Sequence, residues 1–135
     1  MRLFLDTSVL LAACGSARGG SREIFRQSTS EPWVLISTPY VLHEVENNLD
    51  VLDNACRASW PHLQEQLEMR SDILTLNRPA VFGPSKDRPI LFSALAWADV
   101  LLTLDRRDFG RLLGTNFYGL AVMTPGMFLE SRKRP

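Results

Sequence analysis

The sequence is poor in the residues that form disulfide frameworks and zinc sites. It contains two cysteines, Cys14 and Cys56, and two histidines, His43 and His62. Two cysteines outside any Cys-x-x-Cys pair are too few for a disulfide framework, so we expect each to be a small buried side chain. A histidine without a nucleophile–base arrangement is more often a surface or core residue, which is how we interpret both. Neither the cysteines nor the histidines are therefore expected to be metal ligands or a catalytic nucleophile–base pair.

Long apolar runs are also missing. No run approaches the ~20 residues that a helix needs to cross a bilayer. Asp6 interrupts the apolar segment at the N-terminus before it takes the form of a secretory signal. We therefore expect no membrane partner and a cytoplasmic location.

The chain has no net charge at neutral pH, since 15 basic residues balance 15 acidic ones. Without a net positive field, any binding of nucleic acid has to use a local patch. Residues 44–72 carry seven acids and two bases, whereas residues 78–135 carry nine bases and five acids. All but two of the bases are arginine, whose planar guanidinium group binds phosphate in a bidentate manner. A solvated, arginine-rich surface explains the same counts.

The order of strands and helices predicts one α/β domain. Short apolar runs separated by helical patterns indicate a mostly parallel sheet that is covered on both faces. At 135 residues the chain is long enough for one domain with a proper core. Thr38-Pro39 predicts a helix start with Thr38 as its cap, and a second helical pattern covers 53–70. The predicted strands are Leu3–Leu5, Trp33–Ser37, Ile73–Leu76, Val100–Leu104 and Gly119–Met123.

Four carboxylates occupy similar positions relative to the predicted strands. Asp6 and Asp105 come directly after the first and fourth strands. Glu44 lies one turn into the helix after the second strand, and Asp87 opens the helix before the fourth. Because the carboxyl ends of parallel strands meet the amino ends of helices at one sheet edge, we expect these acids to share a site. Four carboxylates without histidine or cysteine suit a hard cation such as Mg²⁺ or Mn²⁺, which indicates metal-assisted attack on a phosphodiester.

Each acid taken alone has a simpler interpretation. Asp6 and Asp87 are good helix N-caps, although we expect Thr7 and Ser8 to cap the first helix. Asp105 precedes an Arg-Arg-Asp sequence, so a polar turn explains it. Glu44 is also explained as an exposed helix residue, and the nearby Glu46 competes for its role. Glu46 is rotated roughly 200° from Glu44 on a helix of 3.6 residues per turn, which favours Glu44. The equivalent placement of all four acids favours a common site.

Three other α/β classes are excluded by particular positions. A haloacid-dehalogenase-type phosphatase requires Asp-x-Asp after the first strand, and Ser8 occupies the second place. A receiver domain requires a lysine at the end of a later strand, and neither Lys86 nor Lys133 lies at one. A nucleotide-binding Rossmann domain requires a glycine-rich turn after the first strand, where this chain has Asp-Thr-Ser.

An ordered set of short motifs resembles those of PIN domains. Single motifs such as Asp-Thr-Ser are common, but the ordered set is specific and spans essentially the whole chain. Its members are Leu3–Leu10, Pro39–Glu44, Ser85–Leu91, Ala98–Phe109 and Thr124–Leu129.

The resemblance implies a three-layer α/β/α sandwich with a mainly parallel sheet of four or five strands, and the activity of a metal-dependent endoribonuclease. Proteins of this family often act as the toxin of a bacterial toxin–antitoxin pair, and often form homodimers. The resemblance therefore implies an RNA substrate, an antitoxin protein as partner and a homodimer. We expect residues 1–130 to form the domain and residues 131–135 to be a short basic tail.

The resemblance also implies roles for particular residues. The acidic quartet that carries catalysis and holds Mg²⁺ or Mn²⁺ corresponds to Asp6, Glu44, Asp87 and Asp105. The accessory hydroxyl positions correspond to Ser8 or Thr7 and to Thr103, and Asp108 corresponds to an additional acid.

The chemistry of phosphodiester cleavage fits these residues. A divalent cation held by the quartet would activate a water and neutralise charge on the scissile phosphate. Crowded carboxylates raise one another's pKa, and a cation relieves that repulsion. Arg88, Arg106 and Arg107 lie beside the acids in the sequence and are candidates for RNA binding through flanking phosphates, although each is equally well explained as a surface arginine. The alternative function is a PIN-like module that binds RNA or a protein without cutting.

Overall fold

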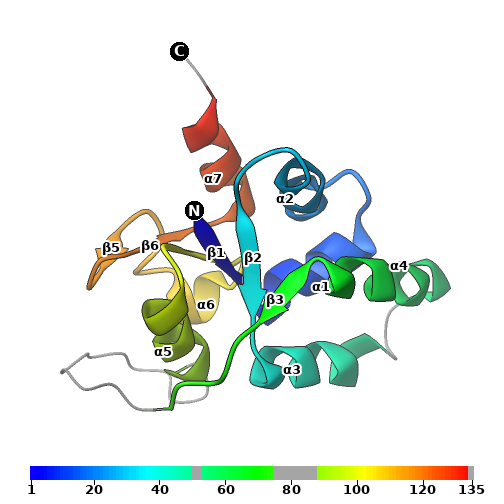
Figure 1. Cartoon of the computed structure of the whole chain (residues 1–135), viewed down its shortest axis with the longest axis horizontal. Coiled ribbons are helices and arrows are strands. Elements are labelled where there is room, and N and C mark those ends of the chain that lie inside the picture. The colour runs from blue at the N-terminus through cyan, green and yellow to red at the C-terminus, as the bar shows by residue number, and fades with distance from the viewer. Residues whose placement is uncertain (50–52, 75–87, 134–135) are drawn as a thin grey trace.

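The structure, a computed structural model, describes residues 1–49, 53–74 and 88–133. Strands and helices alternate along the chain, as the sequence predicts (Figure 1). The strands are β1 (Arg2–Leu5), β2 (Val34–Ser37), β3 (Leu67–Met69), β4 (Val100–Leu102), β5 (Asn116–Phe117) and β6 (Leu120–Met123). The helices are α1 (Thr7–Gly15), α2 (Gly20–Ser28), α3 (Pro39–Leu49), α4 (Asn54–Glu65), α5 (Arg88–Trp97), α6 (Arg106–Phe109) and α7 (Pro125–Arg132).

The strands form one mainly parallel sheet in the order β3-β2-β1-β4-β6-β5. Only the last pair, β5 and β6, is antiparallel. The described sheet has six strands, where four or five were predicted. The additional strand, β5, has two residues and turns into β6 through Tyr118 and Gly119, both with positive φ. So short a strand leaves no alternation of apolar and polar residues from which to predict it.

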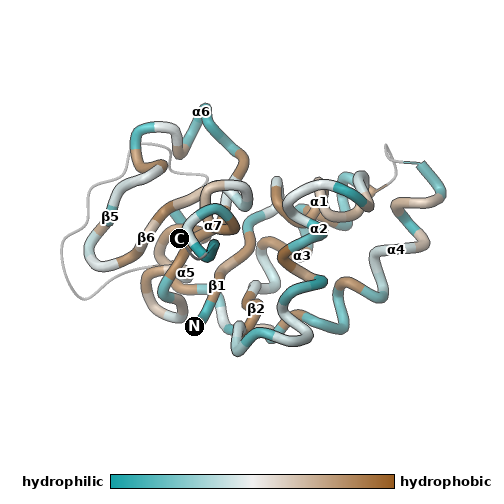
Figure 2. The backbone as a smooth tube through the Cα atoms, turned by 90° about the horizontal axis from the view of Figure 1, so that it is seen from above, coloured by the Kyte–Doolittle hydropathy of each residue, from teal (hydrophilic) through white to brown (hydrophobic). Residues whose placement is uncertain are grey.

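Helices cover both faces of this sheet. Helices α1, α2, α3 and α4 lie on one side, and α5 packs against β1 and β4 from the other (Figures 1 and 2). This is the result of right-handed crossovers, because the chain leaves β1 toward β2 and β3 and then returns to the opposite side of β1. The central strands β1 and β4 are apolar on both faces and buried at Leu3–Leu5 and Val100–Leu102. The three-layer arrangement predicted from the sequence is confirmed.

The third strand is where the sequence predictions are wrong. Helix α4 ends at Glu65, and β3 lies inside the stretch 53–70 that was predicted to be helical. Leu67 is buried there, and pairs in register with Leu35 of β2. Of the strand predicted at 73–76, only Ile73 and the exposed Leu74 are described, and neither lies in a strand. The tertiary pairing with β2 overrides the local helical pattern.

A row of buried polar residues marks the carboxyl edge of the sheet. Each follows the last residue of a strand, and the helix that comes next starts close by. The row consists of Thr38, Asp6, Thr103 and Thr124, after β2, β1, β4 and β6. These four buried polar side chains all lie at the carboxyl edge of the sheet, where the site was predicted.

The predicted division at residue 130 stays a prediction. Helix α7 continues to Arg132, so part of the stretch predicted as a basic tail is helical. Among the described helices, none is long and apolar enough to cross a membrane.

Candidate active site

Asp6 lies at the centre of the carboxyl edge and is nearly inaccessible, with 3% of its surface exposed. Its Oδ1 accepts hydrogen bonds from the Ser8 hydroxyl (2.6 Å) and from the backbone N–H of Val9 (3.1 Å). Its Oδ2 accepts a hydrogen bond from the Thr103 hydroxyl. The bond from Val9 makes Asp6 the N-cap of α1, which corrects the prediction that Thr7 and Ser8 cap this helix. The capping role and the candidate site role belong to the same side chain.

Burial perturbs the ionisation of this carboxyl group. The pKa of Asp6 is raised from 3.8 to about 6, mainly by loss of solvation, with a contribution in the same direction from the negative charge of Asp105. The hydrogen bonds from Ser8, Thr103 and Val9 act in the opposite direction. Among the described residues no basic side chain pairs with Asp6. A cation that binds beside this buried carboxyl group would stabilise its charged form.

Two hydroxyl groups hold Asp6 in place and are themselves fixed by the backbone after β4. The Ser8 hydroxyl accepts a hydrogen bond from the N–H of Leu104 (2.9 Å). The Thr103 hydroxyl accepts one from the N–H of Asp105 (3.1 Å). Each hydroxyl therefore receives a backbone hydrogen and gives its own hydrogen to Asp6. Thr103 and Ser8, both predicted as accessory residues, join the start of α1 to the end of β4.

Glu44 reaches the same edge from α3. The Thr7 hydroxyl donates a hydrogen bond to Glu44 Oε1 at 2.8 Å, across the contact between α1 and α3. Glu44 is half-buried, whereas Glu46 is exposed. This agrees with the expectation that these two side chains point in different directions on the helix.

Asp105 is the N-cap of the short helix α6. Its Oδ1 accepts a hydrogen bond from the N–H of Asp108 at 3.0 Å. The polar turn that offered the simpler interpretation of Asp105 therefore exists, and its carboxylate still faces the site. Asp108 is half-buried, while Arg106 and Arg107 are exposed.

The acids line one cavity of about 230 Å³. Two apolar side chains in its wall, Leu11 and Ile90, were not predicted from the sequence. A signal for Leu11 was present, because it lies one helical turn after Thr7 and Ser8 and so shares their face of α1. The complete lining is Asp6, Thr7, Ser8, Leu11, Glu44, Ile90 and Asp105.

Asp87, the remaining acid of the predicted quartet, lies outside the described residues. The next residue, Arg88, is exposed and begins α5, the helix that carries Ile90 into the cavity wall. Within the described ranges, no group of three histidine, cysteine or acidic side chains is close enough together to hold a metal ion. The donor atoms that the cavity does present are carboxylate and hydroxyl oxygens, which are ligands for a hard cation.

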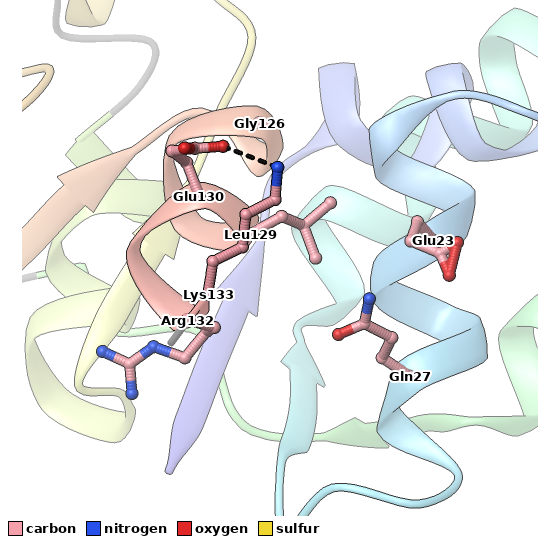
Figure 3. Close-up of a pocket in the computed structure, with 7 residues that line it drawn as sticks. All are labelled: Glu23, Gln27, Gly126, Leu129, Glu130, Arg132 and Lys133. Carbon is pink, nitrogen blue, oxygen red and sulfur yellow. Dashed lines mark ion pairs between the residues drawn. The ribbon is translucent and has the colours of Figure 1, made fainter. Parts of the chain in front are cut away.

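A larger cavity of about 380 Å³ lies between α2 and α7 (Figure 3). It contains none of the predicted site residues. Its charged groups sit on the surface, where Lys133 pairs with Glu130 at 3.0 Å. An exposed ion pair of this kind is worth little, so we assign no chemistry to this cavity.

Comparison with known proteins gives similarity of structure and none of sequence. No protein-family model and no curated protein sequence matches the chain. A chain in the crystal structure of VapBC2 from Rickettsia felis bound to a DNA fragment from their promoter is similar, with a TM-score of 0.62 and 13% sequence identity. The similarity covers 92% of this chain and 98% of that one. The structure of VapC20 from Mycobacterium tuberculosis, described as a sarcin-ricin loop cleaving toxin, gives a TM-score of 0.46 at 19% identity, over 81% of this chain and 93% of that one. The first similarity is one of fold, and agrees with the PIN-like fold predicted from the sequence.

Proposed function

We propose that this protein is a metal-dependent endoribonuclease whose active site is the cavity around Asp6. The observation that carries the proposal is the state of Asp6, a buried carboxylate with a raised pKa that faces Glu44 and Asp105 across one cavity. Perturbed acids in a cleft at the carboxyl edge of a parallel sheet are typical of catalytic sites. The PIN-like fold supports the same class of reaction.

The residues that would hold a Mg²⁺ or Mn²⁺ ion are Asp6, Glu44 and Asp105, with Asp87 assigned from the sequence alone. When bound, the ion would activate a water and neutralise charge on the scissile phosphate. The chain's own contribution is to fix the acids. Ser8 and Thr103 orient Asp6, and Thr7 orients Glu44.

The proposed substrate contacts come from arginines near the cavity. Arg106 and Arg107 are exposed on α6, directly after Asp105, and Arg88 is exposed at the start of α5. Guanidinium groups in these positions can bind the phosphates on either side of the cleaved bond. Because the chain has no net charge, this local patch would supply the attraction for RNA.

The proposal includes a biological setting. The resemblance to PIN domains implies the toxin of a toxin–antitoxin pair, and the similar structure from Rickettsia felis is of VapBC2 bound to a DNA fragment from their promoter. We propose that this chain is likewise the toxin of a toxin–antitoxin pair, active in the cytoplasm as a homodimer and restrained by an antitoxin protein. A small open reading frame next to its gene would support the pairing.

A module that binds RNA or a protein without cutting is the second candidate. It is favoured by the absence, among the described residues, of three metal-binding side chains in close contact. It is also favoured by the helix-capping bonds that already occupy Oδ1 of Asp6 and of Asp105.

Cleavage of RNA by the purified protein, with and without divalent cation, separates the two candidates. The wild type should cut in Mg²⁺ or Mn²⁺ and stop in EDTA. Asp6→Asn should be inactive, because the amide keeps the shape but removes the charge. Asp99→Asn is the matched control, since Asp99 is an exposed aspartate at the opposite edge of the sheet, paired with Arg2 at 3.5 Å. Binding of RNA without any cleavage, or cleavage that persists in EDTA and in Asp6→Asn, would contradict the proposal.

A further inference from the structure

The only two cysteines of the chain, 42 positions apart, meet in the core. Cys14 lies in the last turn of α1 and Cys56 in the first turn of α4. They are neighbours where α4 packs against α1. Both are buried, with 5% and 1% of their surface exposed. Neither thiol has a part in the acid cavity.

The two cysteines lie in the seam between α1 and α4, by which we mean the buried interface that holds α4 to the rest of the protein. Helix α4 buries one stripe, formed by Cys56, Trp60 and Leu63 at helical spacing, and is exposed on its other side. Its main partner among the described elements is α1. Figure 1 shows α4 beside α1 at the outer side of the molecule, with its C-terminal end leading into β3. A bond between the two thiols would therefore fasten the outermost helix at its N-terminal end.

We propose that Cys14 and Cys56 are a redox modification site, which forms a reversible disulfide between α1 and α4 on exposure to a small-molecule disulfide such as oxidised glutathione. The proposal is independent of ribonuclease activity. It rests on the burial of both cysteines in one cluster, at the place where the last turn of α1 and the first turn of α4 belong to two packed helices.

The reaction consists of two thiol–disulfide exchanges. In the first, one protein thiolate attacks a sulfur of the small disulfide, whose S–S bond breaks and releases one small thiolate. In the second, the other protein thiolate attacks the mixed disulfide and releases the second small thiolate. The two protons lost by the cysteines are taken up by the released thiolates, so the protein is oxidised by two electrons and the small disulfide is reduced by two. Burial and the neighbouring Cys56 raise the pKa of Cys14 to about 12, so Cys14 reacts slowly while it is buried.

Burial determines when this reaction takes place. A small disulfide reaches the thiols only when α4 lifts from α1, so oxidation is slow in the folded protein. Once formed, the bond closes a long loop, from residue 14 to residue 56, and restricts the unfolded chain. We expect the oxidised protein to unfold at a temperature several degrees higher than the reduced protein. The acid cavity is left unchanged, because Cys14 lies eight residues after Asp6, about 12 Å away along α1 at 1.5 Å per residue.

The experiment incubates the reduced, folded protein with oxidised glutathione and follows free thiols and intact mass. The wild type should lose both thiols, gain no mass from glutathione and remain a single chain on a non-reducing gel. Its melting temperature should rise, and dithiothreitol should reverse every change. Cys14→Ser and Cys56→Ser should each retain one thiol or carry one glutathione, and show no rise in melting temperature. Cys14→Ala and Cys56→Ala repeat the test without a buried hydroxyl, in case the serine variants fold poorly.

Three outcomes would overturn the proposal. One is a wild type that keeps two free thiols after prolonged oxidation. Another is a wild type that carries two glutathiones or forms only disulfide-linked dimers. The last is an intramolecular disulfide that lowers the melting temperature, which would show that the bond distorts the seam between α1 and α4.

Discussion

Asp6 shows how one residue serves the fold and the site together. Its Oδ1 caps α1, while its Oδ2 is held by Thr103 from the neighbouring strand segment. The capping bond stabilises the helix, but the burial that comes with it makes the charged form expensive. The position that places Asp6 in the candidate site therefore also makes its ionisation unfavourable.

The raised pKa of Asp6 predicts a particular dependence of stability on pH. Below about pH 4 the group is protonated in both the folded and the unfolded chain. Between pH 4 and about 6 the unfolded chain loses its proton first, so the folded chain binds more protons and its stability falls as pH rises. Above that range the folded protein carries the full cost, on the order of 3 kcal/mol. Asp6→Asn does not titrate and should lack this loss.

Urea unfolding in EDTA at a series of pH values measures the effect. The stability of Asp6→Asn minus that of the wild type should grow as pH rises from 4 to 7. Taking the difference removes the titration of the other acids, which both proteins share. Parallel profiles for the two proteins would show that the pKa of Asp6 is not raised in the folded state.

At the scale of elements, α3 is capped differently from the way the sequence predicts. Thr38 was predicted to cap this helix, but its hydroxyl is buried and has no hydrogen-bond partner among the described residues. The cap comes instead from Asp72, whose Oδ2 accepts a hydrogen bond from the N–H of Tyr40 at 3.0 Å. The residue after Asp72 is bonded to α5, because the N–H of Ile73 donates a hydrogen bond to Ser93 Oγ at 2.9 Å. The segment around Asp72 thus connects the two helices that supply Glu44 and Ile90 to the cavity.

We predict that Asp72→Ala destabilises the protein by about 1 kcal/mol and lowers RNA cleavage. The alanine leaves the first turn of α3 without its acceptor, and Glu44 moves with that helix. Asp72→Asn should recover most of both properties, since asparagine caps helices as well as aspartate does. Denaturation and cleavage assays measure the two effects. Glu68→Ala, which removes an exposed acid paired with Arg70 at 2.9 Å, is the control and should change neither. Equal losses in Asp72→Asn and Asp72→Ala would show that charge, and not capping, is what matters here.

Across the whole molecule, the sequence predicted what depends on local order and missed what depends on distant contacts. Sequence reasoning could predict the buried runs of β1 and β4 and the acids that follow them. A parallel sheet needs apolar strands and places their carboxyl ends together. The strand at Leu67–Met69 could not be predicted in this way, because it is set by its pairing with β2. Cys14 and Cys56 lie on α1 and α4, two helices whose packing no local pattern encodes. The hydrogen bond from Thr103 to Asp6 spans 97 positions. The resemblance to PIN domains implied an accessory role for Thr103, but not this bond.

The last prediction concerns the response of the whole protein to metal ions. Above pH 6 the cavity holds mutually repelling acids, so a divalent cation that binds them in the folded chain stabilises that chain against unfolding. At a free concentration a hundredfold above its Kd, the gain is about 2.7 kcal/mol. Thermal unfolding with increasing Mn²⁺, starting from protein stripped with EDTA, should show a dose-dependent rise in Tm for the wild type and for Asp99→Asn. Asp6→Asn should show little or no rise, because the neutral amide has lost the charge that attracts the ion. This readout needs no RNA substrate, so it tests the metal site even if the natural target is never supplied. An equal rise in Asp6→Asn would place the bound metal elsewhere on the protein and contradict the assignment of the acid cavity.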